Sequence, residues 1–572
     1  MIKEKLENLI KRALEDFGVE NPKVELEHPA EISHGDFSSN VSLLYAKDLG
    51  KNPRELAEKI VSILRRTQGD FDFLQKIEIA GPGFINFYLS KDFFISSTKE
   101  ILKEKKDFGL NKNLVGQKII IEYTQPNPFK VFHIGHLVNN IVGEAVSRLI
   151  EAEGPKLKRA TYHGDVGLHV AKVVWALINQ QPLQPTTSTT SSQQLTIEIL
   201  GKAYAEGDRA YEADEAARKE IVEINKKIYE QSDPEINEIY KKGLELSLSH
   251  FKKIYTRLGS KFDASFFESE AGEVGRKLVA KFLAEGMFEK SENAIILSGE
   301  KSGLHTRVFI NSEGLPTYEA KDLGLIELKR KFFKFDRSIT VTDVEQSEYY
   351  KVVVKASEFV FPKLKGKIEH LSHGRLRLSE GRMSSRTGNI IGGEELLNQL
   401  HNLALQKMAE REIENKEDVA DKVAVAALKY SILKQAPGKN IVFDFEKSLS
   451  FEGDSGPYLQ YSAVRAKSVL EKAGQEKIKP SANSESTEIN NVERLLYKFP
   501  EVVEEAAKEF APQKLATYLI ELAGEFNGFY AKEKIVDKTD KNSPYKIALT
   551  EAVFITLQNG LWLLGIEVPE KM

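Results

Sequence analysis

The first hundred or so residues of the chain combine helical and strand-like spacing of apolar side chains. Residues 2–17 carry apolar positions three or four apart, which predicts an amphipathic helix. These positions are Ile2, Leu6, Leu9, Ala13, Leu14 and Phe17. Gly50 and Pro53 separate two further helical runs, and alternating apolar residues around Gly81-Pro82-Gly83 indicate strand, turn and strand. We therefore expect a small α+β domain over residues 1–110.

A second pattern begins at residue 117, where the run QKIIIEYT is typical of a buried parallel strand. A turn containing Pro126 and Pro128 follows, and helical spacing then extends from about 134 to 152. Strand, turn and helix in this order begin a doubly wound α/β sheet. The strand-like runs VFINS, SITVTDV and KIEHLSHGRLR come later, so we expect the sheet to resume there. The pattern predicts a Rossmann-type α/β domain over residues 111–400.

Two largely helical regions lie outside this α/β pattern. Residues 172–260 are mostly helical, and we interpret them as an insertion into the α/β domain. Within them, the Thr-, Ser- and Gln-rich stretch 182–195 is expected to form a mobile surface loop. Residues 401–572 show amphipathic helical patterns divided by the loop-like run KPSANSESTEINN. We expect this last region to form an all-α helical bundle.

The composition excludes several kinds of chemistry. The chain of 572 residues has no cysteine, so disulfides, thiolate zinc sites, iron–sulfur clusters and cysteine nucleophiles are excluded. The net charge of −4 gives no global basic field, although a local basic face would be enough to bind a nucleic acid. No run reaches the roughly 18 apolar residues that a membrane-spanning helix needs. Acidic residues in the first helix argue against a transit peptide, so we expect a cytoplasmic protein without a membrane partner.

The strongest chemical signal is the segment PNPFKVFHIGHL, which begins at Pro126. His133 and His136 are three residues apart at the start of the expected helix, where they would share one face. A helix that starts after a buried strand is a place where phosphate binds. Gly135 would let a ligand approach the backbone, and the two imidazoles could donate hydrogen bonds to phosphates. A structural histidine pair and a His-x-x-His metal site, which would need a third ligand, remain alternatives.

A second signal is the segment GRMSSRTGN, residues 381–389, in which two glycines flank two cations and three hydroxyls. This composition suits a loop that closes on a triphosphate through Arg and hydroxyl donors. By itself the segment is more often a solvated turn. Its value comes from the pairing with the first motif, because the intervening chain leaves room for a split nucleotide-binding fold with an insertion.

Together, His-Ile-Gly-His and the downstream Arg-Met-Ser-Ser-Arg resemble the HIGH and KMSKS motifs of class I aminoacyl-tRNA synthetases. The flanking runs IEYTQPNPFKVFHIGH, HGDVGLH, LPTYEAKDLG, GPYLQYSAVRAK and LLGIEVPEKM resemble the arginyl-tRNA synthetases in particular. The runs HGDFSSN, NPRELA and GPGFINF resemble the N-terminal domain of that family, which contacts the elbow of the tRNA. The resemblance covers essentially the whole chain. It implies an arginine–tRNA ligase that forms arginyl-adenylate and loads the 3′ end of tRNA(Arg).

The resemblance also assigns residues to roles. The implied catalytic residues are Lys130, His133, His136, Arg382 and Arg386. The implied ATP-binding residues are His133, Gly135, His136, Met383, Ser384 and Ser385. The implied arginine-binding residues are Glu122, Asn127, His133, Tyr318, Asp322 and Gln346. The implied tRNA-binding residues are Tyr458, Tyr461 and Arg465 at the opening of the helical bundle.

The arginine-binding set has a physical logic of its own. A guanidinium carries five donors and a permanent charge, so its pocket needs carboxylates and planar acceptors. Glu122 and Asp322 could clamp the guanidinium, with the Tyr318 hydroxyl as a further partner, while Asn127 and Gln346 could hold the α-amino group. In isolation, Glu122 could equally be a surface acid at a strand end and Asp322 a helix N-cap.

The chain departs from the family pattern at four positions. Arg382 and Arg386 replace the lysines of the second motif, which puts in doubt which cation contacts which phosphate. Tyr349 stands where many relatives have His, and Val166 where many have Trp. The resemblance implies ATP as a substrate with Mg²⁺, no zinc, and tRNA(Arg) and arginine as partners, and we expect a monomer. A synthetase for another amino acid, a small nucleotidyltransferase and a non-catalytic RNA-binding paralogue are the competing interpretations.

Overall fold

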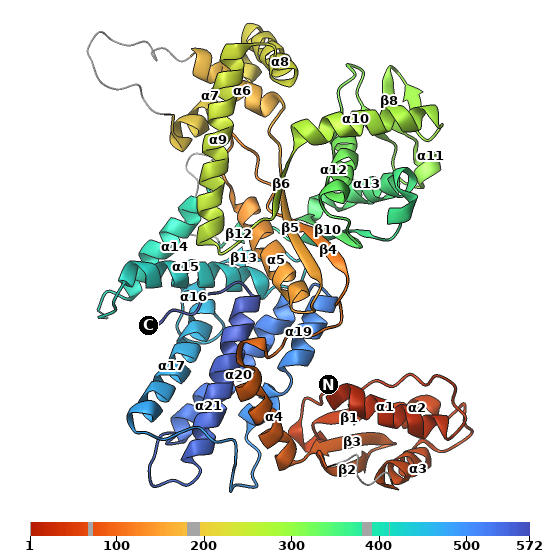
Figure 1. Ribbon diagram of the computed structural model, residues 1–572, viewed down its shortest axis with the longest axis vertical. Coiled ribbons are helices and arrows are strands. Elements are labelled where there is room, and N and C mark those ends of the chain that lie inside the picture. The colour runs from red at the N-terminus through yellow and green to blue at the C-terminus, as the bar shows by residue number, and fades with distance from the viewer. Residues whose placement is uncertain (1, 67–71, 180–194, 380–391, 411) are drawn as a thin grey trace.

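The computed structural model describes residues 2–66, 72–179, 195–379, 392–410 and 412–572 and forms an elongated molecule (Figure 1). The N-terminal domain is a three-stranded antiparallel sheet in the order β1-β3-β2, covered by helices. Its elements are α1 (Ile2–Glu15), β1 (Phe37–Ser39), α2 (Val41–Tyr45), α3 (Pro53–Arg66), β2 (Leu74–Ala80) and β3 (Phe84–Leu89). Helix α4 (Lys91–Glu104) leads from this domain toward the rest of the chain. The expected α+β character of this region is confirmed.

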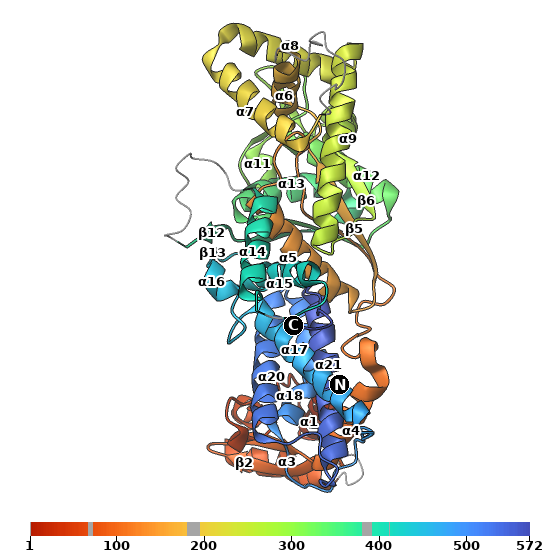
Figure 2. The same cartoon turned by 90° about the vertical axis from the view of Figure 1, so that its left-hand side faces the viewer.

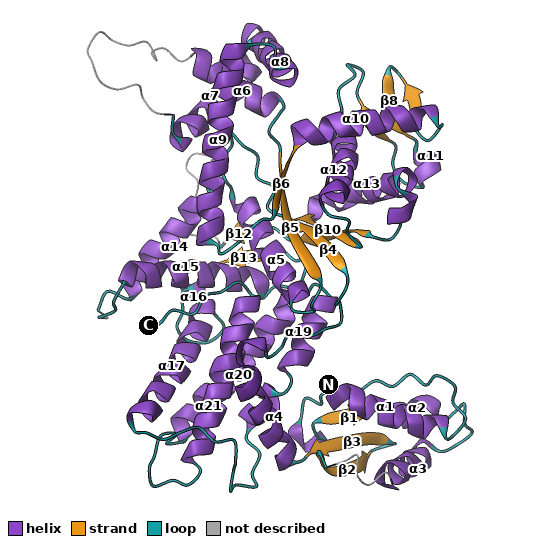
Figure 3. Cartoon of the chain, viewed as in Figure 1, coloured by secondary structure: helices purple, strands orange, loops and turns teal. Residues whose placement is uncertain are grey.

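The centre of the molecule is a five-stranded parallel sheet in the order β11-β10-β4-β5-β6. The strands are β4 (Lys118–Glu122), β5 (Lys156–His163), β6 (Ala264–Phe267), β10 (Arg337–Asp343) and β11 (Ile368–His373). The helices against the sheet include α5 (Ile134–Glu151), α10 (Glu268–Ala284), α12 (Tyr318–Phe332) and α13 (Ser347–Val360). Figure 3 shows this strand layer between helices. The predicted doubly wound α/β fold is confirmed.

The side-chain alternation along β4 explains how the sheet is buried on both faces. Ile119 and Ile121 pack with Val146 of α5 on one face, whereas Ile120 packs with Leu323 of α12 on the other. A strand buried on both sides needs a continuous apolar run rather than an alternating one. The run of isoleucines that signalled a parallel strand therefore reflects its central position in the sheet.

One expected strand belongs elsewhere. The segment VFINS was expected to rejoin the main sheet, but it forms β9 (Arg307–Ile310) in a separate antiparallel sheet of order β7-β8-β9. The other two strands of this sheet are β7 (Glu289–Ser291) and β8 (Ala294–Leu297), and α11 (Gly299–Ser302) lies between β8 and β9. The expectation was wrong because a short apolar run signals a strand without indicating which neighbour it pairs with.

The inserted segment forms a helical unit at one end of the molecule, visible in Figures 1 and 2. Its helices are α6 (Leu168–Asn179), α7 (Ile197–Ala213), α8 (Glu215–Glu230) and α9 (Pro234–Arg257). These helices share a hydrophobic core of their own, which includes Val170, Leu200 and Ile221. All of the Thr-, Ser- and Gln-rich stretch 182–195 except Leu195 lies outside the described residues.

The remaining chain is almost wholly helical, as expected. Its helices are α14 (Gly393–Lys407), α15 (Lys416–Leu433), α16 (Phe445–Ser448), α17 (Gly456–Gln475), α18 (Asn491–Leu496), α19 (Phe499–Lys508), α20 (Pro512–Lys532) and α21 (Ser543–Leu563). Strands β12 (Leu376–Leu378) and β13 (Ile441–Phe443) form a two-stranded parallel sheet beside them. Leu137 and Leu149 of α5 belong to the same hydrophobic core as Leu519 and Leu561 of the bundle. Helix α5 therefore packs on the sheet and on the bundle at once.

The N-terminal domain is docked on the bundle through charged contacts. Asp36 pairs with Arg494 of α18, and Asp36 also accepts a hydrogen bond from the backbone of the N-terminal sheet. Glu501 of α19 accepts hydrogen bonds from Lys3 at 2.5 Å and lies 3.2 Å from the His28 ring. These contacts attach the N-terminal domain to the bundle, at the opposite end of the molecule from the inserted helices (Figure 1).

Candidate active site

A cavity of about 670 Å³ opens at the carboxyl ends of the five parallel strands. Gln125 follows β4, Gly164 follows β5, Glu268 follows β6, and Asp343 and His373 end β10 and β11. The chain runs from β4 outward to β6 and later returns on the other side of β4, so the strand order reverses between β4 and β10. Ligands of open α/β sheets bind at such a reversal point. The cavity is therefore the expected ligand site of this fold.

The two motif histidines cap the helix that points into the cavity. His133 is the N-cap of α5 with an extended backbone, and its Nδ1 accepts a hydrogen bond from Gly135 N at 3.1 Å. His136 Nδ1 accepts a hydrogen bond from His133 N at 3.3 Å, which completes a reciprocal cap. The rings stack with centroids 3.7 Å apart. The pair is adjacent as predicted, but His133 precedes the helix instead of sharing a helical face with His136.

This capping geometry determines the role that each imidazole can play. Because both Nδ1 atoms accept from backbone N–H groups, a neutral ring at either position carries its proton on Nε2. Burial lowers the pKa of His136 well below its usual range and also lowers that of His133, with the nearby Lys130 adding to the effect. Both rings are therefore neutral near pH 7 and keep one N–H donor each at the start of α5, where a phosphate is favoured.

Gly135 and Lys130 also line the cavity. A β-carbon on Gly135 would lie 2.9 Å from a carbon of the His133 ring, so the glycine leaves space for the ring that caps the helix. Gly135 therefore makes room for the His133 ring as well as for any ligand that approaches the backbone. The Lys130 ammonium lies 5.2 Å from the Tyr204 ring centroid of α7 and adds positive charge near the helix start.

Among the described residues, five carboxylates line the cavity: Glu268, Glu319, Asp322, Asp343 and Glu345. Two of them are paired with cations contributed by neighbouring segments. Glu268 accepts a hydrogen bond from the Lys321 ammonium at 2.6 Å, and Glu319 lies 3.8 Å from the Arg307 guanidinium. The charge of these two acids is thus largely balanced within the protein.

Of the remaining three acids, two contact an arginine and the third contacts a tyrosine hydroxyl. Arg375 donates to Asp343 at 2.9 Å and also pairs with Glu345. Asp322, in contrast, accepts its hydrogen bond from the neutral Tyr349 hydroxyl at 2.5 Å. Within the described part of the chain, Asp322 is the carboxylate of this cavity that has no direct cationic partner. A cationic ligand would find its unbalanced negative charge at Asp322.

The position of Asp322 depends on close packing between α10 and α12. A β-carbon on Gly275 of α10 would lie 1.9 Å from the Ala320 carbonyl oxygen, and one on Gly324 would lie 1.9 Å from the Ala271 carbonyl oxygen. The two helices therefore approach so closely that only glycine fits at these points. This contact holds the first turns of α12 at the cavity, where Tyr318 is 66% exposed and Asp322 is buried.

Glu122 does not reach the cavity in this structure, although it was expected to clamp the guanidinium. The alternation of β4 directs Glu122 to the same face as Ile120, where Lys329 of α12 forms a buried ion pair with it. Gln125 donates a second hydrogen bond to the same carboxylate. The side chain is fully buried, and it is not among the residues that line the cavity. Glu122 is not a surface acid either, which was the alternative expectation for this position.

The other expected arginine-binding residues meet at the cavity. Asn127, Tyr318 and Gln346 line it together with Asp322 and His133. The structure adds cavity residues that the sequence argument did not select: Gly164, His169, Glu268, Arg307, Glu319, Tyr349, Asp343, Glu345 and Arg375. Gly164 and His169 lie in the run HGDVGLH and Glu319 lies in LPTYEAKDLG, two runs that resemble the family without assigning roles to these residues. Glu268 and Arg307 lie in neither run, and no local pattern indicates that they reach the cavity.

The basic loop lies outside the described residues, and so do its expected site residues Arg382, Met383, Ser384, Ser385 and Arg386.

The expected RNA-binding residues separate into two environments. Tyr461 and Arg465 of α17 line a second cleft of about 650 Å³. The Arg465 guanidinium lies 4.7 Å from the Tyr461 ring centroid and 5.0 Å from that of Tyr530. Tyr458 packs instead against the bundle core, and its hydroxyl accepts a hydrogen bond from Asn527. The cleft therefore contains two of the three expected residues.

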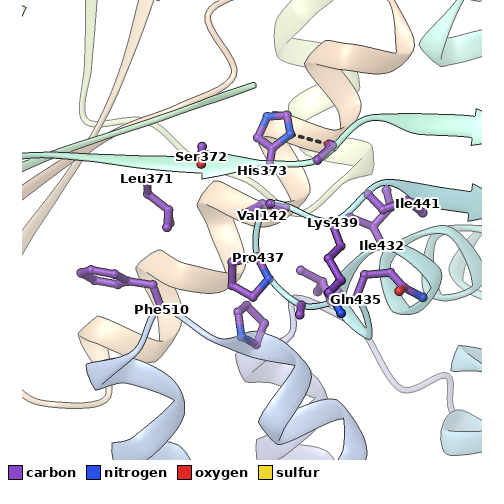
Figure 4. Close-up of a pocket in the computed structure, with 15 residues that line it drawn as sticks. Val142, Leu371, Ser372, His373, Ile432, Gln435, Pro437, Lys439, Ile441 and Phe510 are labelled. Atoms are coloured by element: carbon purple, nitrogen blue, oxygen red, sulfur yellow. Dashed lines mark hydrogen bonds between the residues drawn. The ribbon is translucent and has the colours of Figure 1, made fainter. Parts of the chain in front are cut away.

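A smaller hollow adjoins the main cavity at His373, beneath the end of β11 (Figure 4). Its apolar lining includes Val142, Leu371, Ile432, Pro437 and Phe510. Its volume of about 30 Å³ leaves room for a water molecule but not for an amino acid or a nucleotide. The main cavity is therefore the better candidate for a substrate site.

The described ranges contain no group of three or more His, Asp or Glu side chains arranged to hold a metal ion. In the same ranges, no helix has the length and apolar character that crossing a membrane requires.

The fold is that of the class I tRNA synthetases. The family model for the class I (R) tRNA synthetase catalytic domain matches residues 97–445. The model of the DALR anticodon binding domain matches residues 459–572, and that of the arginyl-tRNA synthetase N-terminal domain matches residues 4–89. The chain belongs to the arginyl-tRNA synthetase family.

Individual relatives match over nearly the whole chain. The arginine–tRNA ligase of Clostridium acetobutylicum is 31% identical and covers 97% of each chain. That of Borreliella burgdorferi is 30% identical over 97% of this chain and 95% of its own. The solved structure of the Thermus thermophilus arginyl-tRNA synthetase superimposes with a TM-score of 0.80 at 26% identity, covering 100% of both chains.

Proposed function

We propose that the chain is an arginine–tRNA ligase that activates arginine with ATP and transfers it to the 3′ end of tRNA(Arg). The observation that carries this proposal is one cavity that combines an anion-binding helix start with a carboxylate, Asp322, that no cation of the described residues contacts directly. The helix start with its two imidazole donors suits the phosphates of ATP, and the carboxylate suits a guanidinium. The curated relatives named arginine–tRNA ligase support the same activity.

In the first step, the arginine carboxylate attacks the α-phosphate of ATP, and arginyl-adenylate and pyrophosphate are formed. In the second step, a hydroxyl of the terminal tRNA ribose attacks the arginyl carbonyl, and AMP leaves. The protein forms no covalent bond in this scheme, so rate enhancement comes from positioning and from donors aimed at the developing charge. His133, His136 and Lys130 are the proposed donors to the phosphates, with Arg382 and Arg386 of the basic loop.

The proposed arginine-binding residues are Asn127, Tyr318, Asp322 and Gln346, with His133 near the α-carboxylate. Asp322 is the proposed acceptor of the guanidinium, since the other acids of the described cavity already face cations. Glu122, paired with Lys329 beneath the cavity, is proposed to act on the substrate only indirectly, through Gln125 and the local charge balance. This division of roles modifies the initial expectation of a two-carboxylate clamp.

Magnesium is proposed to accompany ATP. Mg²⁺ prefers octahedral coordination by phosphates, water and one or two carboxylates. The described cavity offers Asp343 and Glu345, which Arg375 already contacts, and no preformed cage of acids. This donor set fits a magnesium ion that the triphosphate carries and that the protein contacts sparingly.

The cleft on the bundle is the proposed anticodon-binding surface, and the N-terminal domain is the proposed partner of the tRNA elbow. We propose three domains, over residues 1–110, 111–400 and 401–572. We also propose that the enzyme acts as a monomer, which light scattering would test. The Arg465 guanidinium lies within cation–π distance of the Tyr461 and Tyr530 rings in the cleft. Aromatic faces beside a cation suit unstacked single-stranded bases.

Arginine-dependent ATP–pyrophosphate exchange, measured across the amino acids with and without tRNA(Arg), tests the activity. Exchange that arginine alone supports would establish the substrate, and we expect it to require the tRNA. Exchange with a different amino acid would identify another class I synthetase, and no exchange with any amino acid would indicate a non-catalytic RNA-binding protein. Equal rates with and without tRNA would refute the coupling while leaving the ligase assignment intact.

Because Tyr461 lines the proposed RNA-binding cleft, the Tyr461→Ala variant should bind tRNA(Arg) less tightly than wild type. Base–aromatic stacking contributes about 1–3 kcal/mol per base, so we expect binding of tRNA(Arg) to weaken by roughly that amount. Tyr461→Phe, which keeps the ring, should bind nearly as well as the wild type. Tyr211→Ala is the matched control, because Tyr211 of α7 also lies beside two cations but is on the inserted helices. Filter binding would measure the affinities, and an unchanged affinity in Tyr461→Ala would exclude the cleft.

A further inference from the structure

The hydrogen bond between Tyr349 and Asp322 connects two helices at the cavity wall. Tyr349 lies in the first turn of α13 and Asp322 in the second turn of α12, and both line the cavity. The Tyr349 hydroxyl donates to Asp322 Oδ2 at 2.5 Å. The neighbouring Tyr350 ring packs edge-on against the Tyr349 ring, with the two centroids 5.2 Å apart, and so contributes to holding that ring in place.

The surroundings of Asp322 disfavour a charged carboxylate. Burial raises the pKa of Asp322 to about 7, and the neighbouring Glu122 adds to the rise, whereas the hydrogen bond from Tyr349 opposes it. The charged and titratable groups around the Asp322–Tyr349 pair are Glu122 of β4, Tyr162 of β5, Glu268 of α10, Glu319 and Lys329 of α12, and Tyr350 of α13. The cation among them, Lys329, is already paired with Glu122.

A hydroxyl partner differs from a cationic partner in its effect on a ligand. A lysine or arginine beside Asp322 would balance its charge and compete with an incoming guanidinium. A tyrosine hydroxyl stabilises the carboxylate through one hydrogen bond and leaves the negative charge and the other oxygen lone pairs available. The four other acids of the described cavity show the first arrangement, and Asp322 shows the second.

We propose that Tyr349 is a positioning residue that keeps Asp322 ionised and oriented, and that it thereby sets the preference for a charged guanidinium over a neutral urea of the same shape. The inference rests on the proposed function of this cavity. Tyr349 acts through Asp322 and does not take part in the transfer of the adenylyl or arginyl group.

Tyr349→Phe tests the inference through the pH dependence of the arginine KM. Without the hydrogen bond, the pKa of Asp322 rises further, so a smaller fraction of the enzyme is ionised at low pH. At a pH below the Asp322 pKa of both enzymes, each unit by which the pKa of the variant exceeds that of wild type raises the ratio of their arginine KM values about tenfold. This ratio falls toward one once the pH exceeds both pKa values. We expect the KM ratio of variant to wild type to be large at about pH 6 and to fall toward about pH 9, with kcat less affected.

Citrulline provides a second readout, because its neutral urea matches the shape of the guanidinium. An ionised Asp322 repels the urea oxygen, whereas a protonated Asp322 can donate a hydrogen bond to it. The ratio of the citrulline inhibition constant to the arginine KM should therefore be smaller in Tyr349→Phe than in wild type at low pH. Both measurements use pyrophosphate exchange by the full-length enzyme with tRNA(Arg) present.

Tyr518→Phe is the matched control. The buried Tyr518 hydroxyl donates one hydrogen bond to the Leu495 carbonyl oxygen at 3.0 Å, within the helical bundle. This variant loses an equivalent buried hydrogen bond but should keep the wild-type pH profile of the arginine KM. Parallel KM profiles for Tyr349→Phe and wild type, or unchanged citrulline discrimination, would overturn the proposal. A wild-type enzyme without arginine-dependent exchange would instead refute the proposed function, so the two failures are distinguishable.

Discussion

The two ends of helix α5 use their polar groups in opposite ways. At the N-terminal end, His133 and His136 cap the helix through Nδ1 and retain Nε2 donors at the cavity. At the C-terminal end, Arg148 donates to Glu144 at 2.7 Å and to the carbonyl oxygens of Trp562 and Gly259, each at 2.8 Å. One end keeps hydrogen-bonding capacity for a ligand, and the other uses it within the protein.

The contacts at the C-terminal end join three parts of the chain. Gly259 follows inserted helix α9, and Trp562 lies in the last turn of bundle helix α21. Lys429 of α15 lies nearby and donates to the Leu258 carbonyl oxygen at 2.6 Å and to that of Gly565. An arginine and a lysine thus donate hydrogen bonds at the C-terminal ends of α9 and α21, where helix carbonyls lack intrahelical partners. From this comparison we propose that the N-terminal end of α5 serves the reaction and that its C-terminal end serves stability.

His136→Ala should produce the largest effect on activity. The variant loses one donor to the phosphates, and loss of such a donor typically lowers the rate by about 10²–10³. Pyrophosphate exchange with saturating arginine and tRNA would measure the rate, and thermal unfolding would serve as the control for folding. Near-normal turnover in a well-folded variant would contradict the role of this end of the helix.

Arg148→Met should affect stability more than chemistry. The methionine keeps an unbranched side chain beside Trp562, but two carbonyl oxygens and Glu144 lose a charged donor. We expect a loss of about 1.5–3 kcal/mol of stability, since the buried Glu144 carboxylate loses a charged hydrogen-bond donor, whereas water can replace the donor at the two more exposed carbonyl oxygens. Denaturant unfolding would measure the loss, with kcat followed well below the transition.

Arg276→Met is the control for this substitution, because the exposed Arg276 pairs with Glu273 three residues earlier on the same helix. Its stability should stay within about 0.5 kcal/mol of wild type. If Arg148→Met instead preserved stability and lost turnover, the division between the two ends of α5 would be wrong.

Lys429→Met should remove a pH dependence of stability. Burial, with a contribution from the nearby Arg148, lowers the pKa of Lys429 to about 7. An unfolded lysine keeps its proton up to about pH 10.4. Between these values the unfolded state binds more protons, so this residue makes stability rise with pH, by up to about 1.4 kcal/mol per pH unit.

The stability of wild type relative to Lys429→Met should therefore increase as the pH is raised above about 7, and it should be flat below that value. Unfolding midpoints of both proteins across this range would test the prediction. A difference that stays constant with pH would mean that Lys429 remains charged in the folded state.

The sequence predicted the parts of the fold and site that depend on neighbouring residues. The isoleucine run of β4, the turn after it and the start of α5 form one continuous segment, so their order alone indicated a phosphate-binding helix start. The same segment contains His133 and His136, which the structure brings together as expected, with ring centroids 3.7 Å apart. Local spacing was sufficient here because a helix cap is a local structure.

The sequence could not predict which distant groups neutralise one another. Glu122 was expected to bind a guanidinium, but Lys329, more than two hundred residues later, pairs with it on the α12 face of the sheet. The strand VFINS was recognised as a strand but assigned to the wrong sheet. Partner choice in both cases depends on which elements the fold places side by side, and apolar spacing carries no information about that.

The sequence by itself determined the family, the order of α/β and helical regions and the histidine-bearing helix start, because these reside in contiguous motifs and periodic patterns. Only the tertiary structure decided the charge balance of the cavity, in which four acids face cations and Asp322 faces Tyr349. It also decided that the far end of α5 joins α9, α15 and α21 through Arg148 and Lys429. Long-range electrostatics and packing act between residues that are adjacent only in the folded chain.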